Sequence, residues 1–362
     1  MRTLGMSVAA SFSIEYLSYL GADGKPGDEP WPEVAKDAKR LLELYKLMLF
    51  TRSFDSKAVA LQRTGKLGTY ASCLGHEAAH VGIAAAMHVD DVMAVSYREI
   101  GAMLLRGVLP REILLYWGGD ERGSKFSGPQ QDFPICVPIA TQCLHAAGTA
   151  LAFKLRKEPR VAVAFCGDGG SSKTDFYAAL NAAGAFQLPL VLVVVNNQWA
   201  ISVPRSAQTG AQTLAQKGLA GGLDCVQVDG NDLVAVFSAA DHAVRRARNG
   251  HGGTVIEAVT YRLSDHTTAD DARRYRDEAE VKAAWEREPL LRLRHYLQAG
   301  GLWDEGKENA YKDACAKRVD EEVNAYLDVA PPPLSDMFEY TYAEPPLDLL
   351  AQRAEVLAGG KR

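Results

Sequence analysis

The chain has 362 residues, of which 47% are hydrophobic and 23% are charged, and its formal net charge is −5. This length and composition fit one large globular α/β domain with appendages, able to bury a substantial core. The acidic balance gives no sign of a nucleic-acid partner, and no apolar run reaches the roughly 18 residues that a membrane helix needs.

The six cysteines form no CxxC pair and no Cys/His cluster with zinc spacing. Such isolated thiols are typical of reduced cysteines in a cytoplasmic protein. The N-terminal stretch is mildly apolar, but Glu15 interrupts it and no convincing cleavage site follows, so a signal peptide is not expected.

The first half of the chain predicts helices before a regular pattern begins. Turn-rich residues 21–33 lead into apolar positions at helical spacing over residues 34–63, and an Ala-rich helix is expected after Gly75. A strand is predicted at 91–97 and a long polar loop at 118–134.

Strands and helices then alternate. Strands are predicted at 160–166, 189–195, 223–229 and 254–262, with helices between them. This alternation predicts an α/β fold with a doubly wound, mostly parallel sheet and helices on both faces. We expect three regions: an N-terminal segment and helix (1–65), the α/β domain (66–290), and a C-terminal helical region with a proline-rich linker (291–362).

Polar residues follow two neighbouring strands of this sheet. The first strand ends in GDGGSS (167–172), and the second ends in the amides Asn196 and Asn197. One crossover helix joins the strands, so both carboxyl ends emerge at the sheet edge where open α/β folds bind ligands. A carboxylate from Asp168 and an amide oxygen from Asn197 suit Mg²⁺ bound to a diphosphate, and glycines leave room for close approach of the ligand.

The GDG motif followed, after residues 170–195, by NN resembles the thiamine diphosphate motif. Nearly the whole chain resembles the alpha subunit of the thiamine-dependent component of 2-oxo acid dehydrogenase complexes. The resemblance rests on stretches such as LGTYASCLGHEAAHVGIAAAM, YREIGAMLLRGV, GDGGSSKTDFYAALNAAGAF, NNQWAIS and YRLSDHTTADDARRYR.

The resemblance implies a thiamine diphosphate-binding fold and a set of site residues. Mg²⁺ would be bound by the side chains of Asp168 and Asn197 and by the carbonyl of Trp199, where the family usually has Tyr. The implied cofactor-binding residues are Tyr97, Arg98, Val137, Ile139, Gly167, Asp168, Gly169, Gly170, Asn197, Trp199, Ile201 and His266. The implied catalytic residues are His266, Arg262, Tyr275 and Arg276, and Tyr70 is a weaker candidate for the substrate pocket.

Three positions are weighed separately. Lys173 replaces an often acidic residue and leaves the predicted metal ligands intact. Thr267 replaces a serine that is phosphorylated in some relatives, so kinase control is not predicted. His145 is expected on a helix face that packs into the core, and no site role is assigned to it.

The sequence contains one half of a thiamine diphosphate site, the half that binds the diphosphate, but no clear second half. The resemblance implies that a beta subunit completes the site in a heterotetramer of two alpha and two beta chains, and that a lipoyl-bearing acyltransferase is the further partner. The expected activity is oxidative decarboxylation of pyruvate and reductive acetylation of the lipoyl group. Branched-chain 2-oxo acids, acetoin, and a non-catalytic assembly role are the alternatives.

Overall fold

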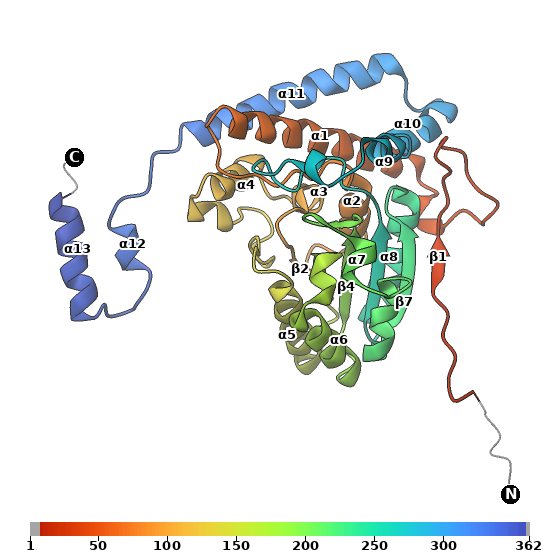
Figure 1. Cartoon of the computed structure of the whole chain (residues 1–362), viewed down its shortest axis with the longest axis horizontal. Helices are drawn as coiled ribbons and strands as arrows, with labels where there is room; N and C mark the ends of the chain where they lie inside the picture. Colours follow the sequence, from red (N-terminus) through yellow and green to blue (C-terminus); the bar gives the residue numbers. More distant parts are fainter. Residues whose placement is uncertain (1–7, 360–362) are drawn as a thin grey trace, which may run out of the picture.

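A computed structural model describes residues 8–359. Its centre is a six-stranded, all-parallel sheet with strand order β1-β7-β8-β4-β3-β2 (Figure 1). The strands are β1 (Glu15–Leu17), β2 (Val92–Ala94), β3 (Ala162–Gly167), β4 (Leu190–Asn196), β7 (Asp224–Asp229) and β8 (Thr254–Val259). The predicted α/β fold with a parallel sheet is confirmed.

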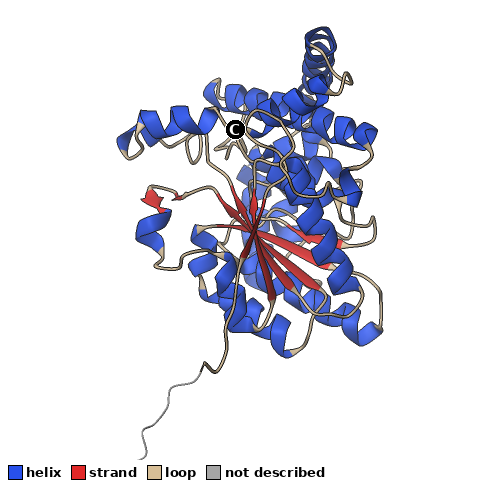
Figure 2. Cartoon of the chain, turned by 90° about the vertical axis from the view of Figure 1, so that its right-hand side faces the viewer, coloured by secondary structure: helices blue, strands red, loops and turns tan. Residues whose placement is uncertain are grey.

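Helices cover both faces of the sheet, which Figure 2 shows edge-on. One face packs mainly against α1 (Ala38–Arg63), α2 (Glu77–Ala85), α3 (Ile100–Leu105), α4 (Pro110–Trp117) and α8 (Leu233–Arg248). The other face packs against α5 (Thr141–Arg156), α6 (Thr174–Ala185) and the 3-10 segment η4 (Ala215–Gly221).

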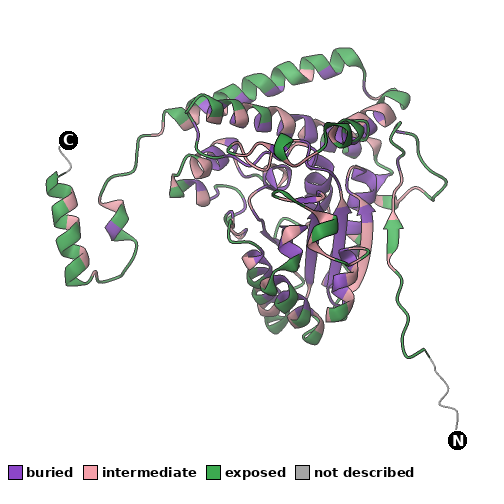
Figure 3. Ribbon diagram, viewed as in Figure 1, coloured by how far each residue is buried: buried purple, intermediate pink, exposed green. Residues whose placement is uncertain are grey.

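The sequence of the central strands explains this double coverage. Successive side chains of a strand point to opposite faces. Phe165 and Val193 accordingly join the core beside α2 and α8, whereas Cys166 and Val194 join the core beside α5 and α6. Every residue of β4 is buried, as expected for a central strand of a parallel sheet (Figure 3).

The remaining elements surround this domain or extend from it. A two-stranded antiparallel ribbon of β5 (Trp199–Ala200) and β6 (Val203–Pro204) follows β4. Helix α11 (Glu305–Leu327) packs along α1 (Figure 1), and α13 (Leu347–Gly359) has no buried residue. The further helical segments are η1 (Glu33–Ala35), η2 (Glu121–Ser124), η3 (Gly169–Ser172), α7 (Arg205–Gln208), η5 (Ala272–Arg274), α9 (Glu278–Trp285), α10 (Pro289–Ala299), α11 (Glu305–Leu327), α12 (Asp336–Glu339) and α13 (Leu347–Gly359).

Several element boundaries differ from the sequence predictions. The sequence does not predict β1, a three-residue edge strand that pairs with β7. The strand predicted at 254–262 ends at Val259, so the last three positions belong to the loop at the sheet edge. The polar loop predicted at 118–134 contains η2.

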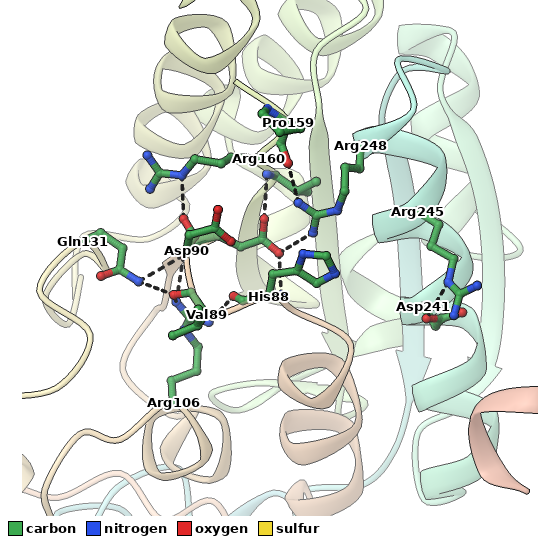
Figure 4. Close-up of polar contacts among 12 residues, drawn as sticks. His88, Val89, Asp90, Arg106, Gln131, Pro159, Arg160, Asp241, Arg245 and Arg248 are labelled. Atoms are coloured by element: carbon green, nitrogen blue, oxygen red, sulfur yellow. Dashed lines mark hydrogen bonds and ion pairs between the residues drawn. The ribbon is translucent and has the colours of Figure 1, made fainter. Parts of the chain in front are cut away.

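Arginine side chains join the amino ends of the strands (Figure 4). Arg106 donates to the carbonyls of His88 at 3.0 Å and Asp91 at 2.7 Å. The Asp91 carboxylate accepts from the Val161 N–H at 2.9 Å and from Arg248 at 2.7 Å. The starts of β2 and β3 are thereby tied to the end of α8, at the edge opposite to the cavity described below. In residues 8–359, no helix combines the length and apolarity needed to cross a membrane.

Candidate functional site

A cavity of about 730 Å³ opens at the carboxyl edge of β3 and β4. This is the edge at which parallel α/β sheets bind ligands. The structure brings all the predicted cofactor-binding residues to its wall: Tyr97, Arg98, Val137, Ile139, Gly167, Asp168, Gly169, Gly170, Asn197, Trp199, Ile201 and His266.

Asp168 lies between the end of β3 and the start of η3, and one oxygen of its carboxylate is available to a ligand. The residue is 2% exposed, and its Oδ2 atom has no hydrogen-bond partner among the described residues. Burial raises the pKa of Asp168 to about 6. A buried carboxylate oxygen without a partner is costly unless a cation or donor meets it.

The glycines around Asp168 keep space for that ligand. A Cβ added to Gly167 would meet no atom within 4 Å, so it would project into the open cavity. A Cβ on Gly169 would lie 2.8 Å from the Cβ of Ala200, so this glycine allows the close approach of the β5–β6 ribbon.

The two amides at the end of β4 have different surroundings. Asn196 donates from Nδ2 to the buried Glu257 carboxylate at 2.6 Å, and it does not line the cavity. Asn197 lines the cavity, and its Oδ1 accepts from the Trp199 N–H at 3.2 Å. The Trp199 carbonyl accepts from Arg262 at 3.2 Å. A carbonyl oxygen has two lone pairs, so this bond leaves one for a further partner.

Arg98 and His266 lie together in the cavity wall. One terminal nitrogen of Arg98 lies 3.2 Å from His266 Nδ1 and 2.9 Å from its carbonyl oxygen. Because a guanidinium can only donate, Nδ1 must accept and the neutral ring carries its proton on Nε2. Burial, followed by the charges of Arg98 and Arg262, lowers the pKa of His266 to about 4.

Arg262, Tyr275 and Arg276 lie behind this wall and do not line the cavity. Arg262 donates to the Ile201 carbonyl and to the Tyr275 hydroxyl, both at 2.8 Å. Arg276 donates to the Arg262 carbonyl. These contacts place the three residues as supports of the β5–β6 ribbon and of His266, and a direct catalytic role for them remains a prediction.

Apolar side chains line the mouth of the cavity. Val137, Ile139 and Ile201 are 47%, 43% and 55% exposed in this chain. Ile201 also has a φ of 57°, which is strained for a β-branched residue. Strained residues concentrate at functional sites, where their surroundings hold them. The Arg262 contact to the Ile201 carbonyl supplies that restraint.

The structure adds residues that the sequence prediction did not assign. Lys217 is buried and donates to the carbonyl and the hydroxyl of Ser171 at 2.9 and 2.8 Å. These two hydrogen bonds hold η3 in place. Burial lowers the pKa of this lysine. His76 and His80 also line the cavity. Both lie in the quoted stretch LGHEAAHVG, but an Ala-rich helix gave no sign that one face borders a cavity.

The structure also locates the three positions that were weighed separately, and Tyr70. Lys173 and Thr267 line the cavity. Tyr70 lies in the core, where its hydroxyl donates to Asp55 at 2.9 Å, and it does not line the cavity. The prediction that His145 faces the core is wrong, since this residue is exposed and stacks on Phe133 with ring centroids 5.6 Å apart.

The charge arrangement favours an anionic ligand that carries a divalent cation. Within residues 8–359, neither Arg98 nor Arg262 pairs with a carboxylate, and their hydrogen-bond acceptors are neutral. Two buried guanidiniums beside a carboxylate with an unpartnered oxygen match a diphosphate and its Mg²⁺. The residues present therefore fit the magnesium–diphosphate group that the sequence predicts.

Comparisons with known proteins agree with this reading. Residues 45–332 match the family described as Dehydrogenase E1 component. The chain is 42% identical over 349 residues to the 3-methyl-2-oxobutanoate dehydrogenase subunit alpha of Mycobacterium tuberculosis, covering 96% of this chain and 95% of the relative. It is 40% identical over 317 residues to the pyruvate dehydrogenase E1 component subunit alpha of Acholeplasma laidlawii, covering 86% and 91%. The pyruvate dehydrogenase E1 component subunit alpha of Staphylococcus epidermidis is 36% identical over 340 residues, covering 93% of this chain and 91% of the relative.

Proposed function

This chain belongs to the dehydrogenase E1 component family, and from that membership we propose that it is the alpha subunit of a thiamine diphosphate-dependent 2-oxo acid dehydrogenase. The observation that carries the proposal is the cavity wall formed in part by Arg98 and Asp168, where the Oδ2 atom of Asp168 has no hydrogen-bond partner within residues 8–359.

Asp168 and Asn197 would hold Mg²⁺ through their side-chain oxygens, and the Trp199 carbonyl would be the third protein ligand. Arg98 would bind the diphosphate, because a guanidinium presents several donors to phosphate oxygens. When bound, thiamine diphosphate supplies the electron sink for loss of carbon dioxide from a 2-oxo acid.

His266 would hold a proton near the reacting carbons. Its Nδ1 atom accepts from Arg98, so the N–H on Nε2 is free to donate to an oxygen of the substrate. The neutral form is held by burial and by the two arginines, which together lower its pKa. The exposed apolar residues at the cavity mouth would exclude water once a second subunit covers them.

Pyruvate is the first candidate substrate, and 3-methyl-2-oxobutanoate is the second. The Acholeplasma and Staphylococcus relatives carry the name pyruvate dehydrogenase, whereas the Mycobacterium relative is named for the branched-chain substrate and matches over more of the chain. We propose a beta subunit, a lipoyl-bearing acyltransferase and a cytoplasmic location as the setting of the reaction.

The test is an assay of this chain purified with its co-encoded second subunit. Decarboxylation of pyruvate and of 3-methyl-2-oxobutanoate is measured with and without thiamine diphosphate and Mg²⁺. The proposal expects cofactor-dependent turnover of at least one substrate, loss of turnover in Asp168→Ala, and unchanged turnover in the exposed control Asp313→Ala. Turnover that needs no cofactor, or that survives Asp168→Ala, would contradict it.

A further inference from the structure

Two histidines at the start of α2 have no hydrogen-bond partner among residues 8–359. His76 immediately precedes the helix and His80 lies one turn further along, with ring centroids 5.5 Å apart. Both residues are 0% exposed, and none of their four ring nitrogens has a partner within the described part of the chain. A buried polar group without a partner is destabilising, so native structures rarely leave several together.

Both rings border the cavity. The start of α2 is fixed at the carboxyl edge of the sheet, where Thr260 Oγ1 donates to the Gly75 carbonyl at 2.7 Å. His80 lies deeper, with its ring edge-to-face on Phe165 of β3 at 6.3 Å. The pair therefore forms the inner wall of the cavity, below the end of β3.

The charges around the pair indicate which ligand it suits. Burial, followed by the charge of Arg98, lowers the pKa of His80 to about 3, and burial, followed by His80 and Arg98, lowers the pKa of His76 well below its ordinary value. A neutral imidazole offers one N–H donor and one acceptor nitrogen. Donors beside Arg98 and Arg262 suit a ligand that is rich in anionic oxygens.

We propose that His76 and His80 are diphosphate-binding residues, each donating an imidazole N–H toward the phosphate oxygens of the ligand. This inference rests on the proposed function and extends it to two residues that the motif around Asp168 does not include. It assigns a partner to one nitrogen of each ring and gives a reason for two polar side chains on the buried face of an Ala-rich helix.

The experiment uses the complex of this chain with its second subunit. His76→Phe and His80→Phe keep an aromatic ring and remove the donors, and His242→Phe on the exposed face of α8 is the matched control. Binding of thiamine diphosphate and of inorganic pyrophosphate, each with Mg²⁺, is measured by calorimetry, and melting curves check the fold. A hydrogen bond to a charged group is worth about tenfold to a hundredfold in affinity.

We expect both site variants to bind both ligands about tenfold to a hundredfold more weakly, with the control unchanged. His76→Gln and His80→Gln retain an N–H donor and should recover part of the loss, which separates binding from a packing defect. Unchanged affinities in the Phe variants would overturn the inference, as would a raised KM for the 2-oxo acid at unchanged cofactor affinity. A wild-type complex that binds neither ligand would contradict the proposed function itself.

Discussion

The side-chain amide of Asn196 donates a 2.6 Å hydrogen bond to the buried carboxylate of Glu257. Glu257 also accepts from the backbone N–H groups of Leu214 at 2.7 Å and Ala215 at 3.0 Å. The first amide of the pair thus joins β4, β8 and the start of η4, whereas the second amide, Asn197, lines the cavity. One residue of the motif supports the sheet, and its neighbour faces the ligand.

This division predicts different phenotypes for two adjacent substitutions. Asn196→Ala should lower the free energy of unfolding by about 1–3 kcal/mol, because it leaves a buried carboxylate without one of its donors. Asn197→Ala should reduce the affinity for Mg²⁺–thiamine diphosphate by at least tenfold with a smaller loss of stability. Urea unfolding measures the loss of stability in both variants, and ligand titration measures their loss of affinity. Equal effects of the two substitutions on both quantities would refute the prediction.

Arg98 should not tolerate replacement by lysine. Its guanidinium bridges the Ser72 carbonyl at 2.5 Å and the His266 carbonyl at 2.9 Å, and a single ammonium cannot reproduce that fork. Arg98→Lys keeps the charge, yet we expect about a tenfold or greater loss of thiamine diphosphate affinity. Arg111→Lys, at a partly exposed position on α4, is the control and should bind like wild type. Full affinity in Arg98→Lys would show that charge alone suffices.

His80 should make the ligand-free protein sensitive to acid. Its pKa is about 3 in the folded chain against 6.5 ordinarily, because burial disfavours the charged ring. Below pH 6.5 the unfolded chain therefore binds a proton that the folded chain does not, so stability falls as the pH falls. The slope from this residue is about 1.4 kcal/mol per pH unit.

Unfolding in urea at several values between pH 7.5 and 5 measures this slope. The wild-type protein should lose stability more steeply than His80→Phe, which has no ring nitrogen to protonate. Parallel pH profiles for the two proteins would show that His80 does not titrate differently on unfolding.

The sequence predicted the central strands because they are long, apolar and separated by amphipathic or Ala-rich helices. It also predicted the ligand edge, since polar residues follow two strands joined by one crossover. Strand β1 was missed because three residues with two exposed positions carry no clear period, and its place is set by pairing with β7. Short edge strands of this kind depend on tertiary pairing more than on local pattern.

The site residues divide in a similar way. Residues close to the GDG and NN motifs were predicted, because the motif places them at the strand ends. His76 and His80 come from a distant segment that tertiary packing brings to the cavity, and Lys217 comes from another that packing brings to Ser171 of η3. His145 was misplaced because the small-residue pattern of α5 does not distinguish its buried face from its exposed one.

The most direct test of this account is a crystal structure of the complex with its second subunit, grown with thiamine diphosphate and Mg²⁺. The account predicts one metal ion at the carboxyl edge of β3 and β4, with oxygens of Asp168 and Asn197 at about 2.0–2.1 Å and phosphate oxygens completing the shell. A diphosphate bound elsewhere, or a metal ion with neither side chain as a ligand, would contradict it.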